Sequence, residues 1–189
     1  MACKIGAYEL LVFETDIRQK DGPWYFLLLV DDFSRVMWVY MLQKKEDAKV
    51  FFHKFVELVE TQNDHKLKAI RSYRGGEFLS SDFGEIFDQK GITRYFTAPY
   101  SPQQNGVIER RNRTVMDMAR SFLKSKMMSC KLWAEAVRHS VYILNRIQTK
   151  ALDGMTPYEA WSGRKPSLEH MRIFGCIAHA KNYNQIEET

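Results

Sequence analysis

Three short apolar runs, each bounded by turn residues, open the chain and limit what it can fold into. They cover residues 8–13, 24–30 and 36–42, and the turn signals Asp21-Gly22-Pro23 and Ser34-Arg35 lie between them. Runs of this length that are rich in Val, Tyr, Phe and Leu are typical of strands. Because the joints are short, the three strands are predicted to form an antiparallel meander.

The remainder of the chain alternates helical spacing with two further strand patterns. Residues 47–61 carry apolar side chains at helical spacing, and the later stretches continue the alternation. The predicted strands are residues 67–71 and 92–96, with a late strand over Phe174–Ala180, and the predicted helices are 82–89, 107–126, 131–145 and a short one that Thr156-Pro157 opens. This order predicts an α/β fold in which helices flank a mixed five-stranded sheet.

Composition excludes several classes of protein. Of the 189 residues, 45% are hydrophobic and 13% aromatic, which excludes wholesale disorder. The longest apolar run, residues 24–30, is far shorter than the ~18 residues that a membrane span needs. Cys3, Cys130 and Cys176 form no CxxC pair, so neither a disulfide framework nor a zinc knuckle is indicated. We expect an intracellular protein, in the nucleus or the cytoplasm, with no membrane partner.

Positive charge is concentrated in the second half of the chain. Residues 1–100 carry 14 basic and 15 acidic side chains, whereas residues 101–189 carry 14 and 8. Six bases lie against one acid, Asp117, in residues 110–126; they are Arg110, Arg111, Arg113, Arg120, Lys124 and Lys126. Such clustering indicates a polyanion as partner. On charge alone, a solvated helix face is the simpler interpretation.

Two carboxylates lie at positions that suit metal chemistry. Asp16 ends the first predicted strand, and Glu109 falls in the first turn of a helix, after a Gln-Asn-Gly loop. An acid on a strand and an acid on a nearby helix can share divalent cations, which activate an attacking oxygen and stabilise a leaving one in phosphoryl transfer. Acids at strand ends and helix N-termini also have routine structural uses, and the spacing alone favours these.

Longer motifs resemble the integrase of copia-type retrotransposons. They are Val-Asp-Asp-Phe-Ser-Arg at 30–35, Arg-Ser-Tyr-Arg-Gly-Gly-Glu-Phe at 71–78 and the stretch from Phe96 to Arg113. Residues 156–161 and 172–176 resemble the segment that follows the integrase core. The resemblance implies a ribonuclease-H-like fold with a C-terminal helical extension. It also implies three parts: residues 1–9 as the remnant of an N-terminal zinc region, 10–128 as the core and 129–189 as the extension.

The family carries an Asp, Asp, Glu triad, with 35 residues between the last two members, and the resemblance implies that this chain keeps only part of it. Glu109 matches the Glu and Asp16 matches the first Asp, but Tyr73 stands at the second Asp. A phenol, with a pKa of about 10, stays neutral at pH 7 and cannot replace an anionic metal ligand. The resemblance therefore implies a remnant catalytic and metal site at Asp16 and Glu109, with weak or absent Mg²⁺ or Mn²⁺ binding.

Nucleic-acid contact does not depend on the missing acid. By resemblance, the residues expected to contact DNA or RNA are Gln104, Asn105, Arg110, Arg111, Arg113, Arg120 and Lys124. The hairpin after Asp16 is short for the family, so we expect a truncated, free-standing descendant, impaired for integration but able to bind nucleic acid. Three alternatives stay open: a host-recruited interaction or regulatory scaffold, a subunit that dimerises with itself or with an intact integrase, and a weakly active polynucleotidyl transferase.

Overall fold

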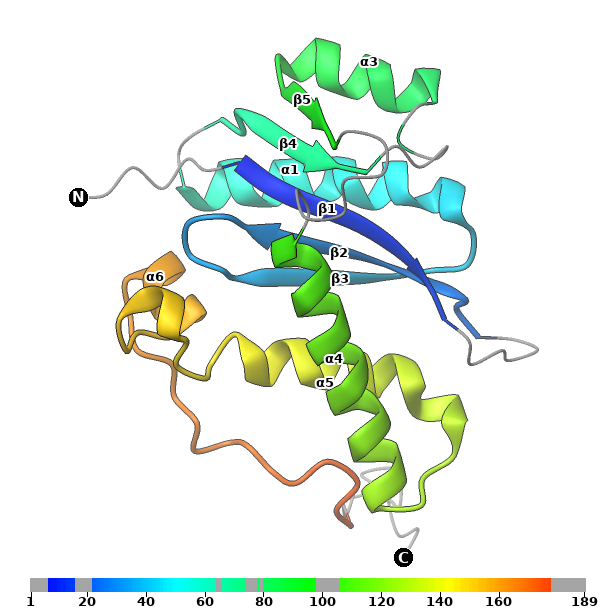
Figure 1. Ribbon diagram of the computed structural model, residues 1–189, viewed down its shortest axis with the longest axis vertical. Helices are drawn as coiled ribbons and strands as arrows, with labels where there is room; N and C mark the ends of the chain where they lie inside the picture. Colours follow the sequence, from blue (N-terminus) through cyan, green and yellow to red (C-terminus); the bar gives the residue numbers. More distant parts are fainter. Residues whose placement is uncertain are drawn as a thin grey trace, which may run out of the picture.

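A mixed five-stranded sheet forms the centre of the molecule (Figure 1). The computed structural model describes residues 7–15, 22–63, 66–73, 78, 80–97 and 106–177. The strands lie in the order β3-β2-β1-β4-β5, with β1–β2 and β2–β3 antiparallel and β1–β4 and β4–β5 parallel. They are β1 (Ala7–Glu14), β2 (Tyr25–Asp31), β3 (Met37–Leu42), β4 (Ala69–Ser72) and β5 (Thr93–Phe96). The predicted meander and the two later strands are confirmed.

Helices cover both faces of the sheet, as the sequence predicted (Figure 1). They are α1 (Ala48–Asn63), α3 (Ser81–Lys90), α4 (Gly106–Ser125), α5 (Trp133–Leu144) and α6 (Pro157–Ser162), with short 3-10 turns η1 (Lys45–Asp47), η3 (Cys130–Leu132) and η4 (Lys150–Leu152). Thr156 caps α6, because its hydroxyl accepts the Glu159 N–H at 3.0 Å. None of the helices in the described ranges is long and apolar enough to cross a bilayer.

The face covered by α1 and α3 is packed with aromatic rings. Alternate residues of β1 point to it, and Tyr8, Leu10 and Val12 are buried there. The helices add Phe52, Phe55, Phe83 and Phe87, whose ring centroids lie 5.2 to 6.4 Å from those of their neighbours. This aromatic cluster is continuous from the β3 edge to β4.

The opposite face is covered by α4 and α5, and its core is mainly aliphatic. The alternate residues of β2, Phe26, Leu28 and Val30, pack against apolar side chains of the two helices. The helix residues buried there include Ile108, Val115, Met116, Trp133, Ala136 and Val137. Since the apolar side of α4 is spent on this contact, its opposite side is left to solvent.

The segment after α5 packs back onto the core. The Asn145 side chain accepts the Met37 N–H at 2.9 Å and donates to the Met37 carbonyl at 2.8 Å, which fastens it to β3. Trp161 of α6 stacks edge-on against Trp38, with centroids 4.9 Å apart. Phe174 lies against Phe122 and His139. The sequence motifs after the core therefore supply packing residues.

One predicted strand is wrong in the part that the structure describes. Residues 174–177 form a turn and irregular backbone, and residues 178–180 lie outside the described ranges. Gly175 has φ 76°, which breaks an extended run, and the neighbouring Phe174 ring is held by Phe122. The apolar residue Phe174 therefore packs onto α4 and α5 and does not belong to a strand of the sheet.

Candidate nucleic-acid interface and remnant acidic site

Tyr73 belongs to the aromatic cluster. β4 pairs with β1 so that Ser72 lies opposite Leu10, and Tyr73 follows directly. Its ring meets Phe78 edge-on at 5.5 Å, and its hydroxyl donates to the Val12 carbonyl at 3.4 Å. The strand that precedes Asp16, β1, and the strand that leads to position 73, β4, are therefore parallel neighbours. Tyr73, at the position that the resemblance assigns to the second acid, thus packs against Phe78 and donates a hydrogen bond to a backbone carbonyl.

Three of the predicted site residues, Asp16, Gln104 and Asn105, lie outside the described residues. Their roles stay predictions. The last described residue before Asp16 is Thr15, whose N–H donates to the Trp24 carbonyl at 2.9 Å, so the β1–β2 pairing runs one residue past β1.

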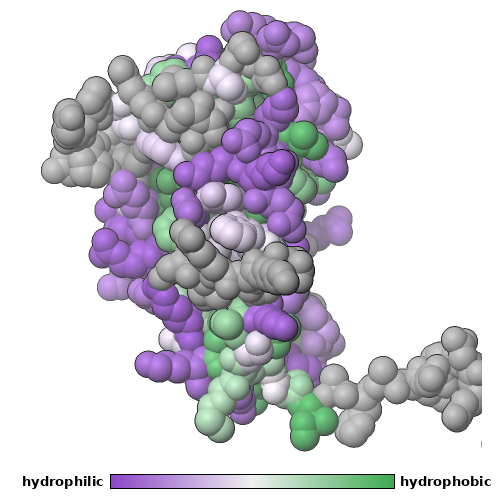
Figure 2. Space-filling view, turned by 90° about the vertical axis from the view of Figure 1, so that its right-hand side faces the viewer, coloured by the Kyte–Doolittle hydropathy of each residue, from purple (hydrophilic) through white to green (hydrophobic). Residues whose placement is uncertain are grey.

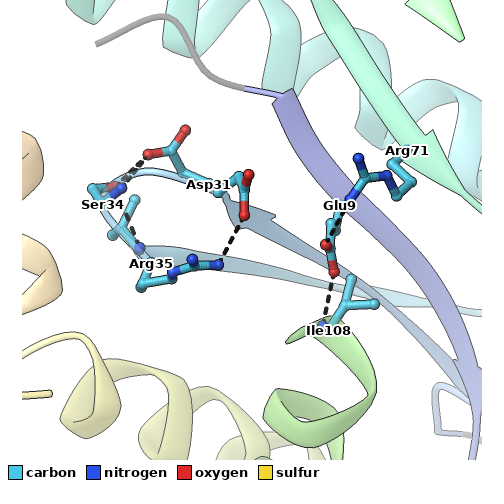
Figure 3. Close-up of polar contacts among 8 residues, drawn as sticks. Glu9, Asp31, Ser34, Arg35, Arg71 and Ile108 are labelled. Carbon is cyan, nitrogen blue, oxygen red and sulfur yellow. Dashed lines mark hydrogen bonds and ion pairs between the residues drawn. The ribbon is translucent and has the colours of Figure 1, made fainter. Parts of the chain in front are cut away.

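A buried carboxylate that sequence reasoning missed, Glu9, meets the start of α4 (Figure 3). Glu9 lies on β1 with 2% of its surface exposed, and its Oε2 accepts the Ile108 N–H at 2.9 Å. Its Oε1 lies 3.5 Å from Nη1 of Arg71 on β4. Burial raises the pKa of Glu9, while the Ile108 N–H and Arg71 act in the opposite direction. Glu9 thus satisfies a free helix N–H and links β1, β4 and α4.

Glu109, the next residue along α4, is exposed. The signal for Glu9 was present in the sequence as a single acid inside the apolar run of residues 8–13. A charged residue in such a run indicates either an exposed edge or a buried partner, and the structure shows the second.

The described donors do not fit a two-metal centre. Among the residues that the structure describes, no group of three His, Cys, Asp or Glu side chains is placed to hold a metal ion. Tyr73 offers a neutral phenol, and that phenol donates to Val12. Glu109 is the one described member of the remnant acid pair.

The basic residues predicted to contact nucleic acid line the solvent side of α4. Arg110, Arg113, Arg120 and Lys124 are exposed, and Arg120 lies 3.4 Å from Asp117. Arg111 is half-buried, and its pKa is lowered by burial and by the nearby positive charges of Arg35 and Arg110. All five predicted bases therefore lie on α4, and four of them are exposed to solvent.

Comparison with known families identifies the domain. Residues 12–102 match the family described as "Integrase core domain". The chain contains an integrase core domain. It is 39% identical over 165 residues to the retrovirus-related Pol polyprotein from transposon TNT 1-94 of Nicotiana tabacum, and 30% identical over 176 residues to that from transposon RE1 of Arabidopsis thaliana.

These alignments cover 87% and 92% of this chain but only 12% of each polyprotein. The integrase core domain therefore has relatives many times its length, and this chain corresponds to a small part of each. The resemblance to copia-type integrase that the motifs indicated is confirmed.

Two solved structures share the fold of this integrase core domain. The simian T-cell lymphotropic virus intasome in complex with PP2A regulatory subunit B56 gamma matches with a TM-score of 0.68 and 14% identity, over 93% of this chain and 58% of that one. The HTLV-2 integrase catalytic core domain in complex with magnesium matches with a TM-score of 0.62 and 18% identity, over 84% and 97%. At these identities the likeness shows the fold alone, and the expected integrase-type sheet is confirmed.

Proposed function

We propose that this chain is a nucleic-acid-binding protein, derived from a retrotransposon integrase core and impaired in DNA strand transfer. The observation that carries the proposal is the exposed row of bases on α4, at Arg110, Arg113, Arg120 and Lys124. Cations on one helix side can neutralise successive phosphates and release their counterions, which drives binding to any sequence. Such contacts position a nucleic acid without requiring catalysis.

The proposed loss of strand transfer rests on Tyr73. Metal-assisted displacement relies on anionic ligands that hold the attacking-side and leaving-side cations. At position 73 the side chain is neutral, donates its hydrogen bond to Val12 and packs against Phe78. We propose that Asp16 and Glu109 alone bind Mg²⁺ or Mn²⁺ weakly or not at all.

The proposed organisation is a remnant of a zinc region over residues 1–9, a core over 10–128 and an extension over 129–189. We propose DNA as the main partner, with a homodimer or a pairing with an intact integrase as the assemblies to test. A host-recruited role is compatible with the same α4 surface, because its bases can contact phosphates although Tyr73 stands at the second acid position.

A salt series tests nucleic-acid binding. The dissociation constant for a duplex DNA is measured by gel shift at several salt concentrations, for the parent and for the triple variant Arg110→Ala, Arg111→Ala and Arg113→Ala. If each arginine neutralises one phosphate, the slope of log K against log salt falls in magnitude by about 0.9 for each contact, or roughly 2.7 in all.

The matched control removes the same charge elsewhere. Lys54, Lys66 and Lys68 are exposed on α1 and on the connection to β4, and their triple Ala variant should keep the parent slope. Equal slopes for the two triple variants would show that net charge alone matters and would contradict an α4 interface.

A second candidate function, binding of a protein partner, is favoured by the end of α4. Met127 is 95% exposed there and lines a hollow of about 430 Å³ together with Leu123, Met128 and Cys130. Arg120 and Lys124 also line this hollow. In Figure 2 apolar residues gather at the lower end of the face shown, whereas hydrophilic residues cover much of it above. A parent that fails to shift DNA at low salt would favour this candidate.

A further inference from the structure

A pocket of about 310 Å³ lies where three separate segments of the chain meet. The first three turns of α4 supply Arg110, Arg111 and Thr114, the β2–β3 turn supplies Arg35, and the segment after α5 supplies Thr149. Three guanidinium groups therefore line one small hollow. Arg35 and Thr149 were not among the predicted site residues.

The β2–β3 turn holds Arg35 in place at the pocket (Figure 3). The buried carboxylate of Asp31 accepts the Ser34 N–H at 2.7 Å and the Ser34 hydroxyl at 2.6 Å. Arg35 adopts φ 61°, and its Nη1 lies 2.8 Å from the Asp32 carboxylate. Asp32 is thus the acid that faces this group, and it offsets one of the three positive charges.

The other two charges are not offset in the same way. Within the described part of the chain, no carboxylate forms an ion pair with Arg110 or Arg111. Arg111 is half-buried, and its pKa is lowered first by that burial and then by repulsion from Arg35 and Arg110. An anion between these groups would relieve the repulsion and replace the water that burial removes.

The third wall of the pocket is fixed to the sheet. The side-chain amide of Asn145 binds the Met37 backbone through its oxygen and its nitrogen. The backbone carbonyl of Asn145 accepts the Tyr158 N–H at 2.8 Å. The Thr149 N–H donates to the Met155 carbonyl at 3.3 Å, and its carbonyl accepts the Leu152 N–H at 3.0 Å. These backbone contacts hold Thr149, which lines the pocket together with Arg35, and its side chain makes no capping hydrogen bond to the turn that it begins.

We infer that this pocket binds a phosphate group through Arg35, Arg110 and Arg111, with the Thr149 hydroxyl as a further donor. Guanidinium forks match the oxygens of a phosphate, and charge-assisted bonds of this kind are the strong ones. Under the proposed function, on which this assignment of source rests, the group is a backbone phosphate of the bound nucleic acid. Arg111 would then act in a built pocket, whereas Arg113 would contact phosphates only at the open surface.

The test uses tripolyphosphate, a probe that offers the phosphate chemistry without bases or sugars. Its affinity is measured by calorimetry at constant ionic strength for the parent, Arg111→Gln, Arg35→Gln and the control Lys54→Gln, which removes an exposed positive charge from α1 on the opposite face of the sheet. Both pocket variants should bind roughly tenfold more weakly or worse, as expected for the loss of a charge-assisted hydrogen bond. Lys54→Gln should bind like the parent.

Competition with duplex DNA identifies the source of the phosphate. Displacement of tripolyphosphate by a short duplex supports a backbone phosphate, and retention of both ligands supports a free phosphate compound as the occupant. If the parent binds tripolyphosphate but no duplex, the pocket stands and the proposed function fails.

Absence of tripolyphosphate binding to the parent, or equal binding by all four proteins, overturns the inference. If Arg111→Gln does not fold by its melting curve, Arg35→Gln decides the question, because Arg35 lies on a different element.

Discussion

The two faces of the sheet are packed with different kinds of side chain. Under α1 and α3, aromatic rings such as Phe52, Phe55 and Phe83 fill the space, and Tyr73 has joined them. Under α4 and α5, an aliphatic core is supplemented by two buried polar links, Glu9 to Ile108 and Asn145 to Met37.

The two faces also differ in the features on which the proposed function depends. On the α1 and α3 side, Tyr73 is a packing residue at the position that the sequence resemblance assigns to an acid, whereas on the α4 side the bases are exposed. Under the proposed function, this fold has lost one metal ligand and has kept a surface for polyanions. We therefore expect the salt dependence of binding, and the pH dependence that Glu9 contributes to stability, on the α4 side.

The largest effect on stability is expected at Asn145. Replacing it by Ala leaves the buried N–H and carbonyl of Met37 without partners and should lower the free energy of unfolding by about 2–6 kcal/mol, since each of these two groups costs about 1–3 kcal/mol. Urea unfolding measures this loss. Ser125→Ala, an exposed change at the end of α4, is the control, and a loss no larger than its own would show that the link to β3 is not structural.

Tyr73 tests the α1 and α3 side. Tyr73→Phe keeps the contact with Phe78 and removes one long hydrogen bond, so it should cost about 0.5–1.5 kcal/mol of unfolding free energy at most. Tyr73→Asp removes the ring as well and should cost more, about 1–3 kcal/mol, because the half-buried site loses its packing. Thermal or urea unfolding of the pair measures both, and an Asp variant as stable as the parent would contradict a packing role.

The smallest effect is expected at Glu9, as a dependence on pH. The folded-state pKa lies above the ordinary value of 4.5, so the folded chain binds more protons than the unfolded chain between the two values. Through that window stability falls as the pH rises. The difference in unfolding free energy, parent minus Glu9→Gln, should therefore shrink from acid to neutral pH, and a difference that grows would show that Arg71 dominates over burial.

Local patterns in the sequence predicted most of the fold. The apolar run of residues 8–13 predicted β1, and the Thr156-Pro157 pair predicted the start of α6, since both signals depend on nearby residues. Phe174 shows the limit. The apolar residues around it are typical of a strand. Phe174 instead packs against Phe122 of α4, which is far away in the sequence, and the backbone turns at Gly175.

The candidate site was predicted only in part for the same reason. The bases of α4 follow one another in the sequence, so their common surface could be anticipated from spacing. Arg35, Arg111 and Thr149 lie far apart in the sequence and meet only because β2, α4 and the segment after α5 are packed together. No local pattern carries that information, and Glu9 was hidden because its partner is a backbone N–H on another element.

We propose that the chain binds DNA but does not join it, and a strand-transfer assay separates these two properties. The parent, Asp16→Asn and Glu109→Gln are incubated with DNA ends in Mn²⁺, beside an active integrase, after gel shift has shown that each binds the substrate. We predict that the parent gives no metal-dependent joining above the level of the two variants, because Tyr73 removes one of the anionic ligands that the chemistry needs. Joining by the parent that disappears in both variants would contradict this account.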